Sequence, residues 1–150
     1  MRTNLTSQIT LNRVSTKYYK PENAVERSVL TRFEKVPTDI YESVDEGVAH
    51  IANEIAGRIQ DRQREGKFFV IGAGTGASLR PLYAELVRKH KDEGLSFRNV
   101  VIFNLYEYYP LAPESAGSSF TQLKDLFVDQ IDIDKQNVFT IDGSIPQEAI

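Results

Sequence analysis

Two short segments contain the residues whose types and spacing could do chemistry. The first is GAGTGAS, residues 72–78, which offers backbone amides and two hydroxyl groups to an anion. The second is NLYEYYP, residues 104–110, which sets one carboxylate, Glu107, among three tyrosines. These residue types favour a phosphate-binding loop and a general base, respectively.

The glycine-rich segment predicts a site for a phosphate group. Its glycines lack Cβ atoms, so the backbone can curl and a ligand can approach the amides. A helix is expected from about Leu79 onwards, and its first N–H groups and its dipole attract an anion. Thr75 and Ser78 add hydroxyl donors. The alternative is a tight strand-to-helix turn that binds nothing.

The pattern of this segment favours a phosphate monoester on a small substrate over a nucleotide. Gly72, Gly74 and Ala77 fit the dinucleotide pattern G-x-G-x-x-[GA], which is a weak signal alone. That pattern also expects an acidic residue at the end of the next strand, where this chain has Asn104. The lysine of a Walker loop is absent as well.

Glu107 is the candidate general base of the second segment. Both segments follow expected strands, and ligands of open parallel sheets bind at the carboxyl ends of strands, so the two should meet. Burial among the tyrosines would raise the pKa of Glu107 towards neutrality, as a base requires. Tyrosine hydroxyls could hold sugar hydroxyls. The alternative is that the tyrosines pack against other structure while Glu107 caps a helix or forms an ion pair.

Short apolar strands alternate with helices along the chain. Residues 67–71, 100–103 and 137–141 are expected to be buried strands. This alternation predicts an α/β fold with a doubly wound parallel sheet (Rossmann-like), of which the chain supplies the N-terminal part with flanking helices.

Three helices should flank these strands. Ser43 and Glu46 form a capping box at the start of the first, and the second runs from about Leu79 to Gly94. A third has apolar residues on one face over 120–131. The apolar stripe of the first helix comprises Val44, Val48, Ile51, Ala52, Ile55 and Ile59.

Residues 1–35 are interpreted as an N-terminal extension or arm with a short helix that Asn23 caps. Residues 36–150 are then the first, incomplete part of the α/β domain. The sheet edge at Ile141 is left open, so the chain could form a homo-oligomer through it.

Composition excludes several classes of function. The net charge of -3 gives no basic footprint for nucleic acid, and no run approaches the roughly 20 apolar residues that span a bilayer. The chain has no cysteine and no apolar secretory segment at its start, which favours the cytoplasm. His50 and His90 have no metal-ligand companion at short spacing, so no metal is expected.

Three stretches together resemble the glucosamine-6-phosphate deaminase (isomerase) family. Residues 69–91, FVIGAGTGASLRPLYAELVRKHK, are similar to the family pattern FVLGLPTGGTPxxxYxxLxxxHK. Residues 95–111, LSFRNVVIFNLYEYYPL, are similar to xSFxxVVTFNMDEYVGL. Residues 118–143 are similar to SYxxFMxxxFFxHxDIxxxNIxxLxG. The resemblance leaves residues 1–35 unexplained.

The resemblance implies a substrate and a reaction. Enzymes of this family open the ring of glucosamine 6-phosphate, isomerise it and release ammonia to give fructose 6-phosphate, without a metal or organic cofactor. A phosphorylated amino sugar is the implied partner. The substrate-phosphate loop maps onto Gly74, Thr75, Gly76, Ala77 and Ser78, and it departs from the family at Gly74, Ala77 and Leu79.

The resemblance breaks at the second segment. The family's Asp, which moves a proton between C1 and C2, is replaced by Tyr106, whose ordinary pKa near 10 makes a poor base. The catalytic candidates are therefore Glu107 and Tyr106. The family's ring-opening residues lie beyond Ile150, so the chain is expected to be the N-terminal portion of a longer protein and inactive alone. Alternatives are a non-catalytic sugar-phosphate-binding or regulatory module, or an enzyme like 6-phosphogluconolactonase.

Overall fold

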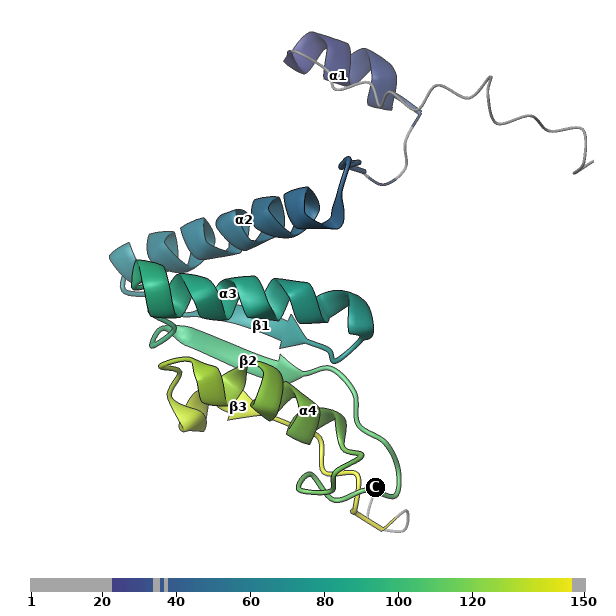
Figure 1. Ribbon diagram of the computed structural model, residues 1–150, viewed down its shortest axis with the longest axis vertical. Coiled ribbons are helices and arrows are strands. Elements are labelled where there is room, and N and C mark those ends of the chain that lie inside the picture. Colours follow the sequence, from purple (N-terminus) through teal and green to yellow (C-terminus); the bar gives the residue numbers. More distant parts are fainter. Residues whose placement is uncertain (1–22, 34–35, 37, 147–150) are drawn as a thin grey trace, which may run out of the picture. The chain divides into compact units, whose positions relative to one another are not determined.

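The computed structural model describes residues 23–33, 36 and 38–146 (Figure 1). The expected arm over residues 1–22 lies outside the described residues. The chain divides into two compact units, residues 1–47 and 48–150. None of the described helices combines the length and the apolar composition needed to cross a membrane.

The described part of the first unit contains helix α1, Ala24–Thr31, and the start of α2, Val44–Arg64. As predicted, the Asn23 side chain caps α1 by accepting the Glu26 N–H at 2.9 Å. Ser43 likewise accepts the Glu46 N–H at 3.1 Å at the start of α2, which confirms one half of the expected capping box.

The apolar stripe of α2 is buried only in part. Ala52 and Ile59 are fully buried, whereas Ile51 is 43% exposed. The described residues therefore bury only part of the apolar face that the sequence predicts for α2. The end of the helix is tied to the sheet by Asn99, whose Nδ2 donates to the Ile59 carbonyl at 3.1 Å and to the Lys67 carbonyl at 3.3 Å.

The sheet has three parallel strands, β1 (Phe69–Ala73), β2 (Val100–Asn104) and β3 (Val138–Phe139), in that order. The predicted parallel α/β class is confirmed. The expected bounds differ from the observed ones in all three strands, and the second strand is one residue longer than expected. The first strand begins and ends two residues later than expected, because its pairing with β2 continues until Ala73 lies opposite Asn104. The third is shorter than expected, because only Val138 and Phe139 pair with β2.

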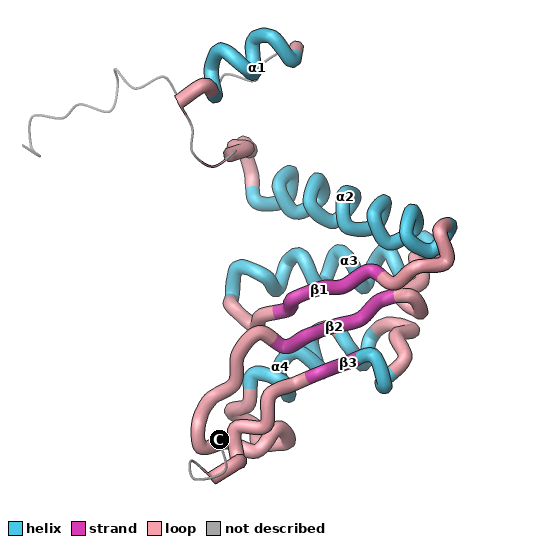
Figure 2. Tube along the Cα trace, turned by 180° about the vertical axis from the view of Figure 1, so that it is seen from behind, coloured by secondary structure: helices cyan, strands magenta, loops and turns pink. Residues whose placement is uncertain are grey.

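Helices α3 (Arg80–Glu93) and α4 (Ser119–Leu126) lie on one face of the sheet, in front of the strands in Figure 1 and behind them in Figure 2. Gly94 ends α3 with φ 73°, as predicted. The third helix is shorter than expected, because the backbone leaves the helical conformation at Phe127.

A core of aromatic and aliphatic side chains fixes these two helices on the sheet. Val100 and Ile102 of β2 are fully buried beneath them. The ring of Phe127 stacks on Tyr83 of α3 at 5.0 Å and meets the edge of Phe97 at 5.5 Å. Burying each such side chain contributes about 2 kcal/mol, so this layer holds the ends of β1 and β2 in place.

The opposite face of the sheet carries an exposed apolar row, and no described helix covers the strands there (Figure 2). The rings of Phe103 and Phe139 stack across β2 and β3 at 4.9 Å. Parallel sheets are usually buried on both faces, so this row is typical of a sheet that takes a second layer. The row consists of Val70, Phe103, Leu105, Phe139 and Ile141.

Candidate functional site

The two chemically suggestive segments meet at the carboxyl edge of the sheet, as the sequence predicts. The chain segments that leave β1 and β2 stay paired, because the Leu105 N–H donates to the Ala73 carbonyl at 2.9 Å. One residue further, the Thr75 N–H donates to the Tyr106 hydroxyl at 2.9 Å. The glycine loop (residues 74–78) and the lip (residues 105–110) therefore lie together, and we treat them as the candidate site.

The glycine loop turns directly into a helix. Gly74 and Thr75 are buried, whereas the next three residues are exposed. The Tyr83 hydroxyl donates to the Gly74 carbonyl at 2.6 Å and so anchors the loop to α3. A short 3₁₀ turn, Ala77–Leu79, leads into α3. The first N–H groups of such a turn lack acceptors within it, which is the condition that an anion-binding loop requires.

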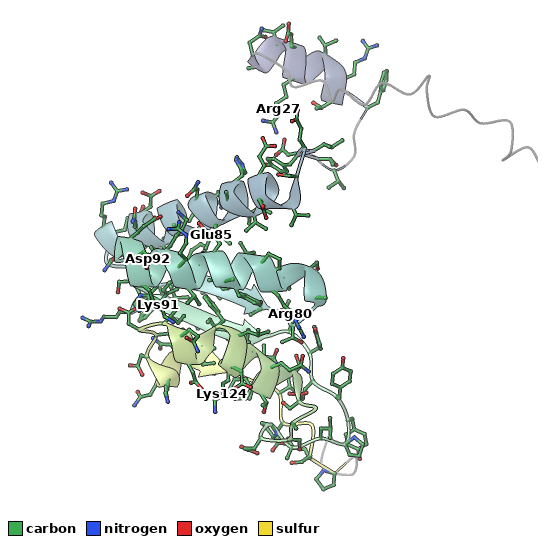
Figure 3. The ribbon with its side chains drawn as sticks, in the orientation of Figure 1. Arg27, Arg80, Glu85, Lys91, Asp92 and Lys124 are labelled. Carbon is green, nitrogen blue, oxygen red and sulfur yellow. The ribbon has the colours of Figure 1, made fainter. Side chains whose placement is uncertain are left out.

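One positive charge stands beside the loop. Arg80, the first residue of α3, is exposed and makes no ion pair with any other described residue (Figure 3). The first turn of α3 contains no acidic residue either. The sequence reading missed Arg80, although its place two residues beyond Ser78 was a usable signal.

Tyr106 lies against the loop. Its hydroxyl accepts the Thr75 N–H and is also 2.9 Å from the Thr75 Oγ1. Its ring stands close enough to Gly74 that a Cβ there would lie 3.3 Å from Tyr106 Cε1. Its hydrogen bonds with the hydroxyl and the backbone N–H of Thr75 lower the pKa of Tyr106 from its ordinary value. Tyr106 is thus a phenol in contact with the loop, where the family pattern has a carboxylate.

Glu107 faces the other way and caps α4. Its carboxylate accepts the Ser118 hydroxyl at 2.6 Å, the Ser119 N–H at 2.7 Å and the Phe120 N–H at 3.0 Å. It also accepts the Tyr108 N–H at 2.9 Å. A carboxylate at a helix N-terminus is favoured both by these donors and by the helix dipole.

The expected rise in the pKa of Glu107 is wrong. Burial by itself raises this pKa, but the hydrogen bonds from Ser118 and from the amides of Phe120, Tyr108 and Ser119 together lower it below the ordinary value. A carboxylate stabilised in its charged form by four donors is a weak base. The geometry therefore supports the alternative of helix capping, while a catalytic role for Glu107 remains a prediction.

The sequence reading also missed the residues that support the lip. Asn104 donates from Nδ2 to the Tyr106 carbonyl at 2.9 Å, and Ser119 lies 3.0 Å from the Thr75 Oγ1. Gly143 packs against the lip so closely that a Cβ would lie 2.4 Å from the Tyr108 carbonyl oxygen. The serines before 120 were a usable signal, because Ser is a preferred N-cap. The contact of Gly143 with Tyr108 joins distant parts of the chain, whereas Asn104 lies only two residues before Tyr106.

The remaining tyrosines of the lip are exposed. Tyr108 and Tyr109 are 55% and 61% exposed, so they do not pack into the described core. The ring of Tyr108 meets that of Tyr106 edge-on at 6.3 Å. Among the described residues, no group of three or more His, Cys, Asp or Glu side chains is arranged to hold a metal ion.

Solved structures share this architecture. A monomeric glucosamine-6-phosphate deaminase matches with a TM-score of 0.66 and 27% identity, over 71% of this chain and 43% of that protein. A 6-phosphogluconolactonase from Thermotoga maritima matches with a TM-score of 0.55 and 24% identity, over 67% of this chain and 44% of that protein, which is a likeness of fold alone. The fold class is that of these α/β sugar-phosphate enzymes.

Sequence comparison finds relatives whose names share one sugar phosphate. A glucosamine-6-phosphate deaminase-like protein from Bacteroides thetaiotaomicron is 58% identical over the whole chain, which covers 23% of that relative. A glucosamine-6-phosphate isomerase from Candida albicans is 35% identical over 104 residues, 69% of this chain and 41% of the relative. No family model matches. The predicted resemblance to the glucosamine-6-phosphate deaminase family is confirmed, and the chain spans less than half the length of these relatives.

Proposed function

We propose that this chain forms the phosphate-binding part of a glucosamine-6-phosphate deaminase-like protein. In this proposal the loop of Gly74, Thr75, Gly76, Ala77 and Ser78 holds the phosphate of a phosphorylated amino sugar. The main observation in support is the Thr75 N–H. It takes no part in the strand pairing and donates at 2.9 Å to the Tyr106 hydroxyl at the edge of the sheet. A loop that presents an amide there can present it to a phosphate oxygen. Arg80 would add a cation beside the bound phosphate.

The reaction proposed for the longer protein is the deamination of glucosamine 6-phosphate to fructose 6-phosphate and ammonia in the cytoplasm. The names of the similar proteins support it. Within this chain, the loop would bind substrate and the lip would border the sugar. The chain alone is expected to show no turnover.

A non-catalytic sugar-phosphate-binding module is the second candidate. It is favoured by the hydrogen bonds of Glu107 and by the residue type at position 106, the two catalytic candidates in the lip. The Glu107 carboxylate is held by four hydrogen bonds, and Tyr106 is a phenol where the family pattern has an aspartate. Neither group is arranged as a free carboxylate base.

An Ala77→Pro variant tests the binding site. Gly76, the preceding residue, already has φ -59° and ψ 149°, which the residue before a proline prefers. Proline is also tolerated at the first position of a helical turn, so the change removes one N–H with little strain. We expect affinity for glucosamine 6-phosphate, measured by calorimetry, to fall by about tenfold or more because one charge-assisted hydrogen bond is lost.

An Ala77→Ser variant is the matched control, because it keeps the amide and should bind as the unaltered chain does. Glucosamine, which lacks the phosphate group, should bind to neither variant. Equal affinity of the proline and serine variants would refute the loop as the phosphate site.

Ammonia release separates the two candidate functions. The longer protein that contains this chain is assayed with glucosamine 6-phosphate, and the enzyme proposal expects ammonia and fructose 6-phosphate. Binding of the sugar phosphate without ammonia would instead establish the non-catalytic module.

A further inference from the structure

The Tyr106 hydroxyl occupies the place that a ligand oxygen would take on Thr75. It accepts the Thr75 N–H at 2.9 Å, and that N–H belongs to the loop proposed to bind phosphate. The hydroxyl is joined to the loop a second time through the Thr75 Oγ1 at 2.9 Å. The loop is therefore engaged by an oxygen atom of the chain's own side chain.

Neighbouring polar groups hold this pair in place. Asn104 Nδ2 donates to the Tyr106 carbonyl at 2.9 Å, and Ser119 Oγ lies 3.0 Å from the Thr75 Oγ1. The Tyr106 hydroxyl therefore accepts the Thr75 N–H and shares a second hydrogen bond with the hydroxyl of the same residue.

This contact can be displaced. Tyr106 is 39% exposed, so solvent reaches this residue. Its hydroxyl is neutral, whereas a phosphate oxygen is charged, and hydrogen bonds to charged acceptors are roughly twice as strong as neutral ones. A phosphate oxygen is therefore a stronger acceptor for the Thr75 amide than the phenol is.

We propose that Tyr106 is a tethered occupant of the phosphate loop, which a sugar phosphate must displace, and that it thereby sets the affinity of the site. This inference rests on the proposed function of the loop. Displacement would also free the Tyr106 hydroxyl to contact the bound sugar, so Tyr106 is a specificity-determining residue of the same site.

Tyr106→Phe is the decisive variant, because it keeps the ring and removes the competing oxygen. We expect its affinity for inorganic phosphate, measured by NMR titration of the 150-residue chain, to rise roughly three- to tenfold, the worth of one ordinary hydrogen bond. Ser115→Ala is the control, because it removes a hydroxyl group outside both the loop and the lip, and it should leave the affinity unchanged. Equal or weaker binding by Tyr106→Phe would overturn the proposal.

A second measurement excludes an effect on loop structure alone. In the unaltered chain, saturation with phosphate should shift the ¹³Cζ resonance of Tyr106, which reports on its hydroxyl, but not that of Tyr108. Phosphate binding without that shift would overturn the inference and leave the phosphate loop intact. If neither the unaltered chain nor Tyr106→Phe binds phosphate, the proposed function fails, and the inference fails with it.

Discussion

Two adjacent residues of the lip accept hydrogen bonds from backbone amides near two different helix starts, one through a charged group and the other through a neutral group. At the start of α4, the Glu107 carboxylate accepts four hydrogen bonds, two of them from the Ser119 and Phe120 amides. At the glycine loop before α3, the neutral Tyr106 hydroxyl accepts one amide, that of Thr75. These two contacts come from adjacent residues of one short segment.

The difference separates a structural cap from a binding site. An internal carboxylate satisfies both the amides and the dipole of α4, so that helix start has nothing to offer an external anion. Among the described residues, no carboxylate hydrogen-bonds to the loop before α3, and Arg80 beside it makes no ion pair. An anion is therefore expected at the loop and not at α4.

Glu107→Gln should produce the largest effect on stability. The amide can accept from only part of the donor set and loses the charge that favours the helix start, so we expect a loss of about 2–3 kcal/mol in the free energy of unfolding. Urea denaturation followed by circular dichroism measures it. If Glu107 were instead a free catalytic base, the variant would be as stable as the unaltered chain.

Acid should weaken the same contact. Because the pKa of Glu107 is lowered in the folded chain, its contribution is fully present above the ordinary glutamate value of 4.5 and is lost as the pH falls through the folded pKa. Urea midpoints measured across that range should fall more steeply for the unaltered chain than for Glu107→Gln. Parallel pH profiles would show that the carboxylate does not stabilise the fold.

Ser118→Ala should have an intermediate effect. Ser118 donates to Glu107 and accepts the Thr121 N–H at 3.2 Å as the N-cap of α4. Loss of such a cap costs about 1 kcal/mol, measurable by the same denaturation. Ser115→Ala, in the preceding loop, is the control and should change stability by a few tenths of a kcal/mol at most. Equal effects of the two changes would contradict the capping role.

Tyr106→Phe should have the smallest effect on stability, about 1 kcal/mol or less, because only a partly exposed neutral hydrogen bond is lost. Thermal denaturation measures it. A loss as large as that of Glu107→Gln would mean that Tyr106, too, is a structural element, and the contrast between the two helix starts would disappear.

Local sequence patterns predicted the helices and strands, whereas the bounds of the strands depend on pairing between distant parts of the chain. Asn23 and Gly94 act within one turn of their own helices, so their roles could be read from sequence. The extension of β1 through Gly72 and Ala73 could not, because it depends on pairing with β2 some 31 residues later in the numbering, as between Ala73 and Asn104. Glycine carries no apolar signal that would mark it as part of a strand.

The meeting of the glycine loop and the lip was predicted, but the contacts between their residues were not. That the glycine loop and the lip converge follows from the general rule for parallel sheets. The role of Glu107 depends on donors 11 to 13 residues ahead, and the link from Thr75 to Ser119 spans 44 residues. Burial alone would have raised the pKa of Glu107, and only the folded chain reveals the donors that lower it.

Amide NMR of the chain titrated with glucosamine 6-phosphate tests the central claim most directly. If the loop binds phosphate, the amides of Thr75, Gly76, Ala77 and Ser78 should show saturable shifts. The amides of Ser119 and Phe120, which Glu107 already holds, should not shift. An unchanged glycine loop, or larger shifts at Ser119 and Phe120 than in the loop, would contradict this assignment.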